Sequence, residues 1–96
     1  MKHYEIMFII RPTLGEDDIK KVADNFENVL KTNGGNVTNF KEMGQRELAY
    51  EINKFKNGYY FLINVDAEND EATKEFDRLA RNSKDIIRHL ITKIEN

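Results

Sequence analysis

The sequence predicts an α+β fold, a four-stranded antiparallel sheet with two helices on one face. Two segments, residues 16–32 and a segment that begins near residue 70, have the apolar spacing of amphipathic helices. Four other segments have the alternation or the short apolar runs of strands. The resulting order is β-α-β-β-α-β, which is satisfied by the spatial strand order 4-1-3-2. This is the ferredoxin-like arrangement.

The first strand is expected over residues 2–10 and the first helix over residues 16–32. One face of the strand is wholly apolar or aromatic and should meet the core; it consists of Tyr4, Ile6, Phe8 and Ile10. Pro12 cannot donate to a sheet ladder, so the strand should end before it. The helix begins with acidic residues, which suit its positive end, and Gly34–Gly35 should close it.

A long second strand is expected from residue 36 to about residue 53, with Gly44 marking a bulge or bend inside it. We expect Asn57–Gly58 to form the hairpin turn, because this dipeptide readily adopts positive φ. The returning strand should then cover residues 59–65. Its inward residues should be Phe61, Ile63 and Val65, and its outward residues Tyr60 and Leu62.

The second helix should bury a stripe of Ala72, Phe76, Leu79 and Ala80. The last strand is expected over residues 86–94, and its facing stays open because both parities carry apolar residues. Acidic residues dominate residues 66–77 and basic residues dominate residues 78–93. A helix with acids first and bases last complements its own dipole, but this does not explain Arg88 and Lys93 beyond the helix.

Length and composition set limits on the function. The 96 residues should form one domain, 1–96, and the net charge of −2 argues against a generic polyanion binder. The sequence has no cysteine, which excludes a disulfide framework, a thiolate zinc site and a thiol nucleophile. It shows neither an apolar run of about 20 residues nor a signal-peptide pattern, so we expect a cytoplasmic protein without a membrane contact.

No catalytic pattern stands out, so we expect a protein that is not an enzyme and uses no cofactor, metal or small-molecule substrate. His3 and His89 lie on different expected strands, without an obvious nucleophile beside either. The single serine, Ser83, lacks a G-x-S-x-G setting, and no P-loop or G-x-G-x-x-G is present. His3 and Glu5 should point the same way, but a third metal ligand is missing.

The sheet face away from the helices is expected to be partly apolar. Its assigned residues are His3, Glu5, Met7, Ile9, Tyr60 and Leu62. A solvated sheet face is normally polar, so this composition favours a docking surface over scattered surface apolar residues. The segment KNGYYFLI partly matches an RNA-recognition motif, but Tyr59 and Phe61 should point inwards, where they cannot stack on bases.

Three segments in order resemble one family. KHYEIMFIIRP resembles the R-x-Y-E strand that opens ribosomal protein six of the bacterial small subunit. GQRELAYEINKFKNGYY resembles the G-x-R-x-L-A-Y-x-I-x-K…G-x-Y signature of that family, and FDRLARNSKDIIRHLITK resembles its closing helix and strand. The resemblance covers essentially the whole chain. Glu51 departs from it where many members have proline, and Ser83–Lys84 where Asn-Asp is common.

The resemblance implies a non-enzymatic component of the small ribosomal subunit. Its partners would be the central domain of small-subunit ribosomal RNA and ribosomal protein eighteen, which would bring much of the positive charge. The residues expected to contact RNA phosphate or the partner chain are Lys2, Arg46, Lys54, Arg88 and Lys93, each of which could instead be a solvated surface base. The residues expected at the protein interface are Glu5, Met7, Tyr60 and Leu62.

A ferredoxin-like regulatory or dimerisation module remains the alternative. Such a module would form a stable homodimer through the sheet and would not depend on RNA. A ribosomal protein of this kind would be a monomer when isolated and would then gain its partner.

Overall fold

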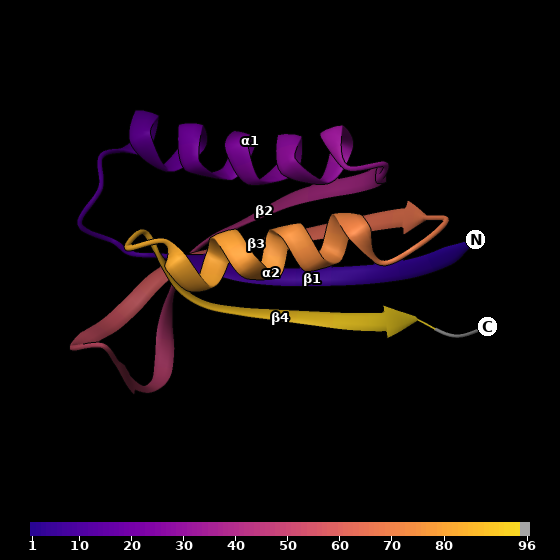
Figure 1. Ribbon diagram of the computed structural model, residues 1–96. Coiled ribbons are helices and arrows are strands. Elements are labelled where there is room, and N and C mark those ends of the chain that lie inside the picture. Colours follow the sequence, from indigo (N-terminus) through magenta and orange to yellow (C-terminus); the bar gives the residue numbers. More distant parts are fainter. Residues whose placement is uncertain (95–96) are drawn as a thin grey trace.

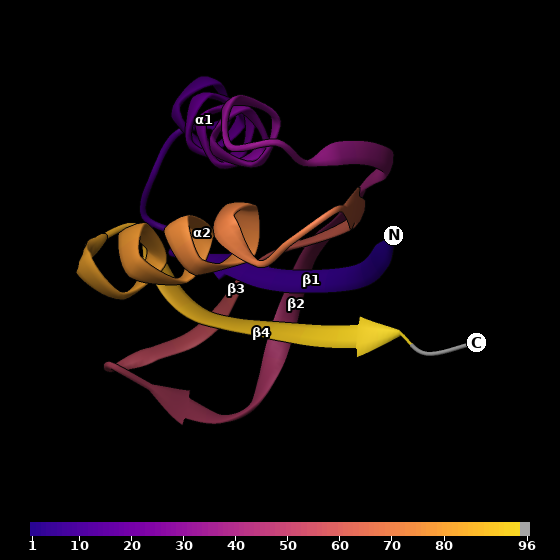
Figure 2. The same cartoon turned by 45° about the vertical axis from the view of Figure 1, so that its right-hand side comes forward.

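The computed structural model describes residues 1–94, and these form six elements in the predicted order (Figure 1). The elements are β1 (Lys2–Ile10), α1 (Glu16–Thr32), β2 (Asn36–Ile52), β3 (Phe55–Ala67), α2 (Glu71–Asn82) and β4 (Ile86–Ile94). All neighbouring strands are antiparallel in the order β2-β3-β1-β4, which is the predicted order read from the other edge. Figures 1 and 2 show both helices on the same face of the sheet. The ferredoxin-like prediction is confirmed.

The main core fills the space between the two helices and the sheet, and aromatic rings occupy its centre. Phe8 of β1 stacks on Phe61 of β3, with ring centroids 5.3 Å apart, and meets the edge of Phe76 at 5.6 Å. Phe26 of α1 meets Phe76 of α2 at 5.1 Å, which joins the two helices. The residues predicted to face this core from β1 and β3 are all buried there: Tyr4, Ile6, Phe8, Ile10, Phe61, Ile63 and Val65.

Helix α2 buries most of the stripe of residues that was predicted. Ala72, Phe76 and Ala80 are buried, whereas Leu79 packs against the core and is only half-buried. Thr73 is buried as well, although its side chain is polar. Its hydroxyl donates a hydrogen bond of 3.1 Å to the carbonyl oxygen of Asp70, so the burial leaves no unpaired donor.

Gly44 bends the long strand β2, as predicted. It has a φ of +84°, and the pairing register between β2 and β3 shifts between Glu42 and Gly44. An extra residue of this kind makes a β-bulge, which increases the local twist and bends the strand. Figures 1 and 2 show the consequence, since the far end of the β2–β3 hairpin leaves the sheet on the side away from the helices.

The predicted position of the hairpin turn is wrong. Asn57 and Gly58 lie inside β3, paired with Glu47 and Arg46 of β2. The turn is formed by Asn53 and Lys54 instead, which both have positive φ, +51° and +70°. Strand β3 therefore begins four residues earlier than predicted.

The glycine at position 58 serves close packing and not a turn. A Cβ atom there would collide with Cγ2 of Ile9 and would lie 3.3 Å from Cδ1 of Ile87. A glycine inside a strand is typical of such a close approach, and the sequence pattern alone does not separate it from a turn.

A second, smaller core lies on the sheet face away from the helices. Ile9, Leu48 and Ile87 are buried there, and Ile52, Phe55 and Tyr60 pack against them. Ile9 lies on the predicted face but is only 2% exposed, because the bent hairpin covers it. The face is therefore open only in part.

Candidate nucleic-acid and protein interface

The open sheet face carries an apolar row at its middle. Met7 of β1 pairs with Leu62 of β3 on one side and with Leu90 of β4 on the other. These three residues point to the same face, and we call them the apolar row. Leu90 is 53% exposed, whereas Met7 and Leu62 are half-buried. Exposed apolar side chains that lie next to one another are more typical of docking surfaces than isolated ones.

The flanking rows give this face two chemically different ends. Toward the hairpin, Ile9 lies between Tyr60 and Arg88. In the other direction, Glu5 lies between Asn64 and Thr92. The next row holds His3, whose ring nitrogen lies 2.5 Å from a carboxylate oxygen of Asp66. The four residues predicted at the protein interface thus lie in three successive rows: Glu5, Met7, Leu62 and Tyr60.

Three of the five predicted RNA-contact residues lie toward the hairpin end. Arg46 pairs with Gly58 and is exposed, and Lys54 is at the turn. Arg88 is exposed at the start of β4, and its Nη1 donates a hydrogen bond of 2.8 Å to Oη of Tyr50. This bond joins β4 to the hairpin across a separation of 38 residues.

Lys2 and Lys93 do not join that group. Lys2 pairs with Ala67 and Lys93 with Tyr4, at the opposite end of β1. Both have the parity of the buried residue Tyr4, so they belong to the helix side of the sheet. The five predicted basic residues therefore form two groups and not one patch.

Lys2 is engaged inside the protein. Its Nζ donates to a carboxylate oxygen of Asp70 at 3.1 Å, and the buried Tyr4 hydroxyl donates to the same oxygen. The two hydrogen bonds, that from Tyr4 first, lower the pKa of the Asp70 carboxyl. The bond to Asp70 raises the pKa of Tyr4, and burial adds to this effect.

A small hollow opens where the hairpin bends over the sheet. It has a volume of about 90 Å³, and the residues that line it include Met7, Ile9, Leu48, Tyr50, Tyr60 and Arg88. Three of these are predicted site residues. The hollow thus lies at the boundary between the apolar row and the basic end of the face.

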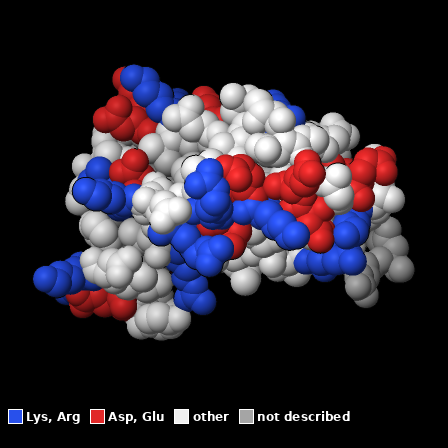
Figure 3. All heavy atoms as spheres, in the orientation of Figure 1, with Lys and Arg blue, Asp and Glu red and all other residues white. Residues whose placement is uncertain are grey.

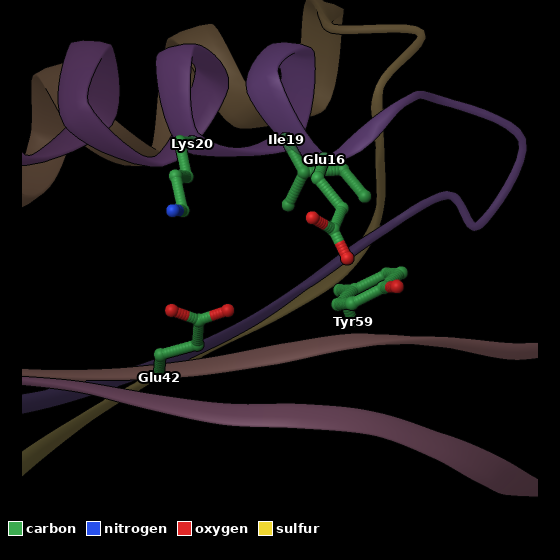
Figure 4. Close-up of a pocket in the computed structure, with 5 residues that line it drawn as sticks. All are labelled: Glu16, Ile19, Lys20, Glu42 and Tyr59. Atoms are coloured by element: carbon green, nitrogen blue, oxygen red, sulfur yellow. The ribbon is translucent and has the colours of Figure 1, made fainter.

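Two further hollows contain none of the predicted site residues. One, of about 250 Å³, lies between α1 and the sheet and is lined by Glu16, Ile19, Lys20, Glu42 and Tyr59. Figure 4 shows Lys20 and Glu42 pointing toward each other across it, with Glu16 directed toward Tyr59. The other, of about 320 Å³, is lined by Arg78, Arg81 and Asn82 of α2.

The charge reversal along α2 is visible on the surface. In Figure 3, acidic atoms gather over the beginning of α2, and basic atoms gather over its C-terminal half and the start of β4. Arg78 forms an ion pair with Glu75, and Arg81 pairs with Asp77 at 2.7 Å. Asp77 also lies 2.7 Å from the ring of His89, and these contacts, that with His89 first, lower the pKa of the Asp77 carboxyl. The basic residues of α2 are thus partly neutralised by the helix itself.

Residues 1–94 contain no group of three histidine or acidic side chains arranged to hold a metal ion. In the same part of the chain, no helix is both long enough and apolar enough to cross a membrane.

Comparison with known proteins identifies the family. The family model of ribosomal protein S6 matches residues 3–93. The chain belongs to the ribosomal protein S6 family. The crystal structure of 30S ribosomal protein S6 from Thermotoga maritima is similar, with 28% sequence identity and a TM-score of 0.93. The match covers 97% of this chain and 87% of the Thermotoga chain.

Membership of the ribosomal protein S6 family confirms the resemblance seen in the sequence. The chain has a structural role in translation as a component of the small subunit of the ribosome, and it belongs to the cytoplasm with that particle. The family is one of structural proteins and not of enzymes.

The exposure of Tyr50 differs from what the sequence pattern predicts. The alternation of Leu48, Tyr50 and Ile52 along the sequence predicts local packing for all three. Leu48 is buried and Ile52 half-buried, but Tyr50 between them is 63% exposed. The regular pairing of β2 with β3 stops between Glu47 and Ile52, so period-two parity no longer applies there.

Proposed function

We propose that this S6-family chain binds the central domain of small-subunit ribosomal RNA together with ribosomal protein eighteen. The observation that supports this most directly is the apolar row of Met7, Leu62 and Leu90 on the sheet face opposite α1 and α2. Such a row would bury its apolar area against a partner protein. Glu5 and Tyr60, in the adjoining rows, would extend the contact.

The RNA would meet the basic end of the same face. Arg46, Lys54 and Arg88 lie there, next to the expected protein interface. Lys2 and Lys93 would provide a second contact on the helix side, at the opposite end of the sheet, where Lys2 would exchange its ion pair with Asp70 for one with a phosphate. Because the net charge is −2, the partner protein would supply much of the positive potential.

The test is a titration of a central-domain RNA fragment with this chain, with and without ribosomal protein eighteen, at two salt concentrations. We expect tight, salt-sensitive binding that requires both proteins. Arg88→Gln should weaken binding and lower the slope of log K against log salt by about one. Arg78→Gln is the matched control, because Arg78 is also exposed but lies on α2, on the other side of the sheet.

Light scattering on the isolated chain tests the alternative. A monomer that joins the RNA only with its partner supports the proposal. A stable homodimer that binds no RNA when protein eighteen is present would overturn it and favour a dimerisation module.

A further inference from the structure

Tyr50 is an exposed aromatic residue held in place by an arginine. Its side chain is 63% exposed, although the neighbouring Leu48 and Ile52 turn toward the sheet. Its hydroxyl accepts the 2.8 Å hydrogen bond from Nη1 of Arg88. The bond fixes both long side chains against each other, so neither must lose as much freedom when a ligand binds.

Among residues 1–94, Arg88 keeps most of its hydrogen-bonding capacity in this arrangement. A guanidinium group has five N–H donors, and Tyr50 is the partner of only one nitrogen. Arg88 itself is exposed on the open face. The pair therefore offers an aromatic surface and an uncommitted cationic donor side by side.

We infer that Tyr50 and Arg88 together bind one unpaired nucleotide of RNA. The base would stack on the exposed ring of Tyr50, and the free donors of Arg88 would contact its phosphate. Aromatic stacking combined with a guanidinium contact is the usual way in which proteins hold unpaired nucleotides. The inference rests on the proposed function. It further specifies that the hairpin end of the face recognises an unpaired part of the RNA.

Size and charge favour a nucleotide over a larger ligand or an apolar side chain. The hollow beside Tyr50 measures about 90 Å³, well below the roughly 300–1,000 Å³ of pockets that enclose a whole small molecule. It has room for part of a ligand whose remainder lies outside. Between residues 45 and 57, three exposed bases, including Arg46 and Lys54, outnumber two exposed acids, and this net positive charge suits a phosphate-bearing ligand.

The test compares Tyr50→Leu with Tyr50→Phe in the complex of this chain, ribosomal protein eighteen and the RNA fragment. Tyr50→Leu should lower RNA affinity about tenfold, the usual loss for one stacked base, without changing the salt slope. Tyr50→Phe keeps the ring and should stay within about threefold of the wild type. Arg88→Gln should instead lower the salt slope by about one. Ultraviolet crosslinking of the wild-type complex should attach a nucleotide to the peptide that contains Tyr50.

The outcomes separate this inference from the proposed function. If Tyr50→Leu binds the RNA as tightly as the wild type, and the wild-type complex gives no crosslink at Tyr50, the inference is overturned and the proposed function stands. A Tyr50→Leu variant that loses affinity for protein eighteen in the absence of RNA would also overturn it, since Tyr50 would then belong to the protein interface. Failure of the wild-type chain to bind the RNA fragment would overturn both.

Discussion

Gly58 of β3 lies directly against Ile9 of β1, so that a Cβ atom at position 58 would overlap Cγ2 of Ile9. This contact fixes how closely the hairpin approaches the sheet. Leu48 and Ile87 pack around Ile9 at the same point, and the hollow beside Tyr50 opens next to them. The shape of the candidate RNA end of the face therefore depends on glycine at position 58, which has no side chain.

We predict that Gly58→Ala destabilises the protein by about 1–3 kcal/mol, the usual cost of overpacking a core. The added methyl group would push Ile9 or the hairpin out of position. Urea unfolding measures the change in free energy. The same substitution in an Ile9→Ala background should cost clearly less, because the overlapping Cγ2 atom is then absent. Equal costs in both backgrounds would contradict a steric origin of the effect.

Replacing the turn residue Lys54 with glycine should stabilise the protein. Lys54 has a φ of +70°, which costs a non-glycine residue about 1–2 kcal/mol. Glycine adopts this φ freely, but its greater conformational entropy in the unfolded chain lowers the free energy of unfolding by about 0.4–1 kcal/mol. We therefore expect Lys54→Gly to raise the free energy of unfolding by about 0.5 kcal/mol.

Lys56→Gly is the control for that measurement. Lys56 is also exposed but lies inside β3, where glycine should lower stability. If both substitutions shift the urea midpoint in the same direction, relief of turn strain is not the cause.

The regular parts of the fold could be predicted from the sequence because periodicity is a local property. The bounds of β1, α1 and β4 were predicted to the residue, since alternation marks β1, helical spacing marks α1 and a segment rich in apolar residues marks β4. The bulge at Gly44 was also predicted, because a glycine inside an alternating strand often marks a bulge or a bend. The turn was misplaced because Asn57–Gly58 is a common turn sequence, whereas the need for glycine arises from Ile9, far away in the chain.

The candidate site was predictable only in part for the same reason. Parity within β1 and β3 placed Glu5, Met7, Tyr60 and Leu62 on one face. Gly44 predicts a bend but not its direction, which buries Ile9 under the hairpin. The exposure of Tyr50 follows from the break in strand pairing between Glu47 and Ile52, which no local pattern predicts. The separation of Lys2 and Lys93 from the other bases likewise depends on the pairing register between strands.

Stability should fall at alkaline pH through Tyr4. The hydrogen bond to Asp70, burial and the charge of Asp70 raise the pKa of Tyr4 above its ordinary value of 10.0. Because the folded pKa is the higher one, this stabilisation is complete below pH 10.0 and is lost as the pH rises through the folded pKa. Urea unfolding between neutral pH and pH values above 10.0 should show this loss, and Tyr4→Phe should show a smaller one.

A tyrosinate absorbance titration provides an independent check. The chain has four tyrosines, and Tyr4 should ionise above its ordinary pKa of 10.0 or only on unfolding. Asp70→Asn removes the carboxylate and should bring the titration of Tyr4 closer to its ordinary range. If Asp70→Asn leaves the titration unchanged, the carboxylate is not the main cause.

The apolar row should matter for the partner and not for folding. Leu90 is 53% exposed, so Leu90→Asp should change the free energy of unfolding by no more than about 0.5 kcal/mol. At an interface, the same carboxylate would be buried beside Met7 without a partner, and we expect binding of ribosomal protein eighteen to weaken at least about tenfold. Isothermal titration calorimetry measures the affinity.

Asn28→Asp is the control for this measurement, because it adds the same charge on the exposed side of α1 and should leave the affinity unchanged. Equal affinities for the wild type and Leu90→Asp would place the partner elsewhere on the molecule.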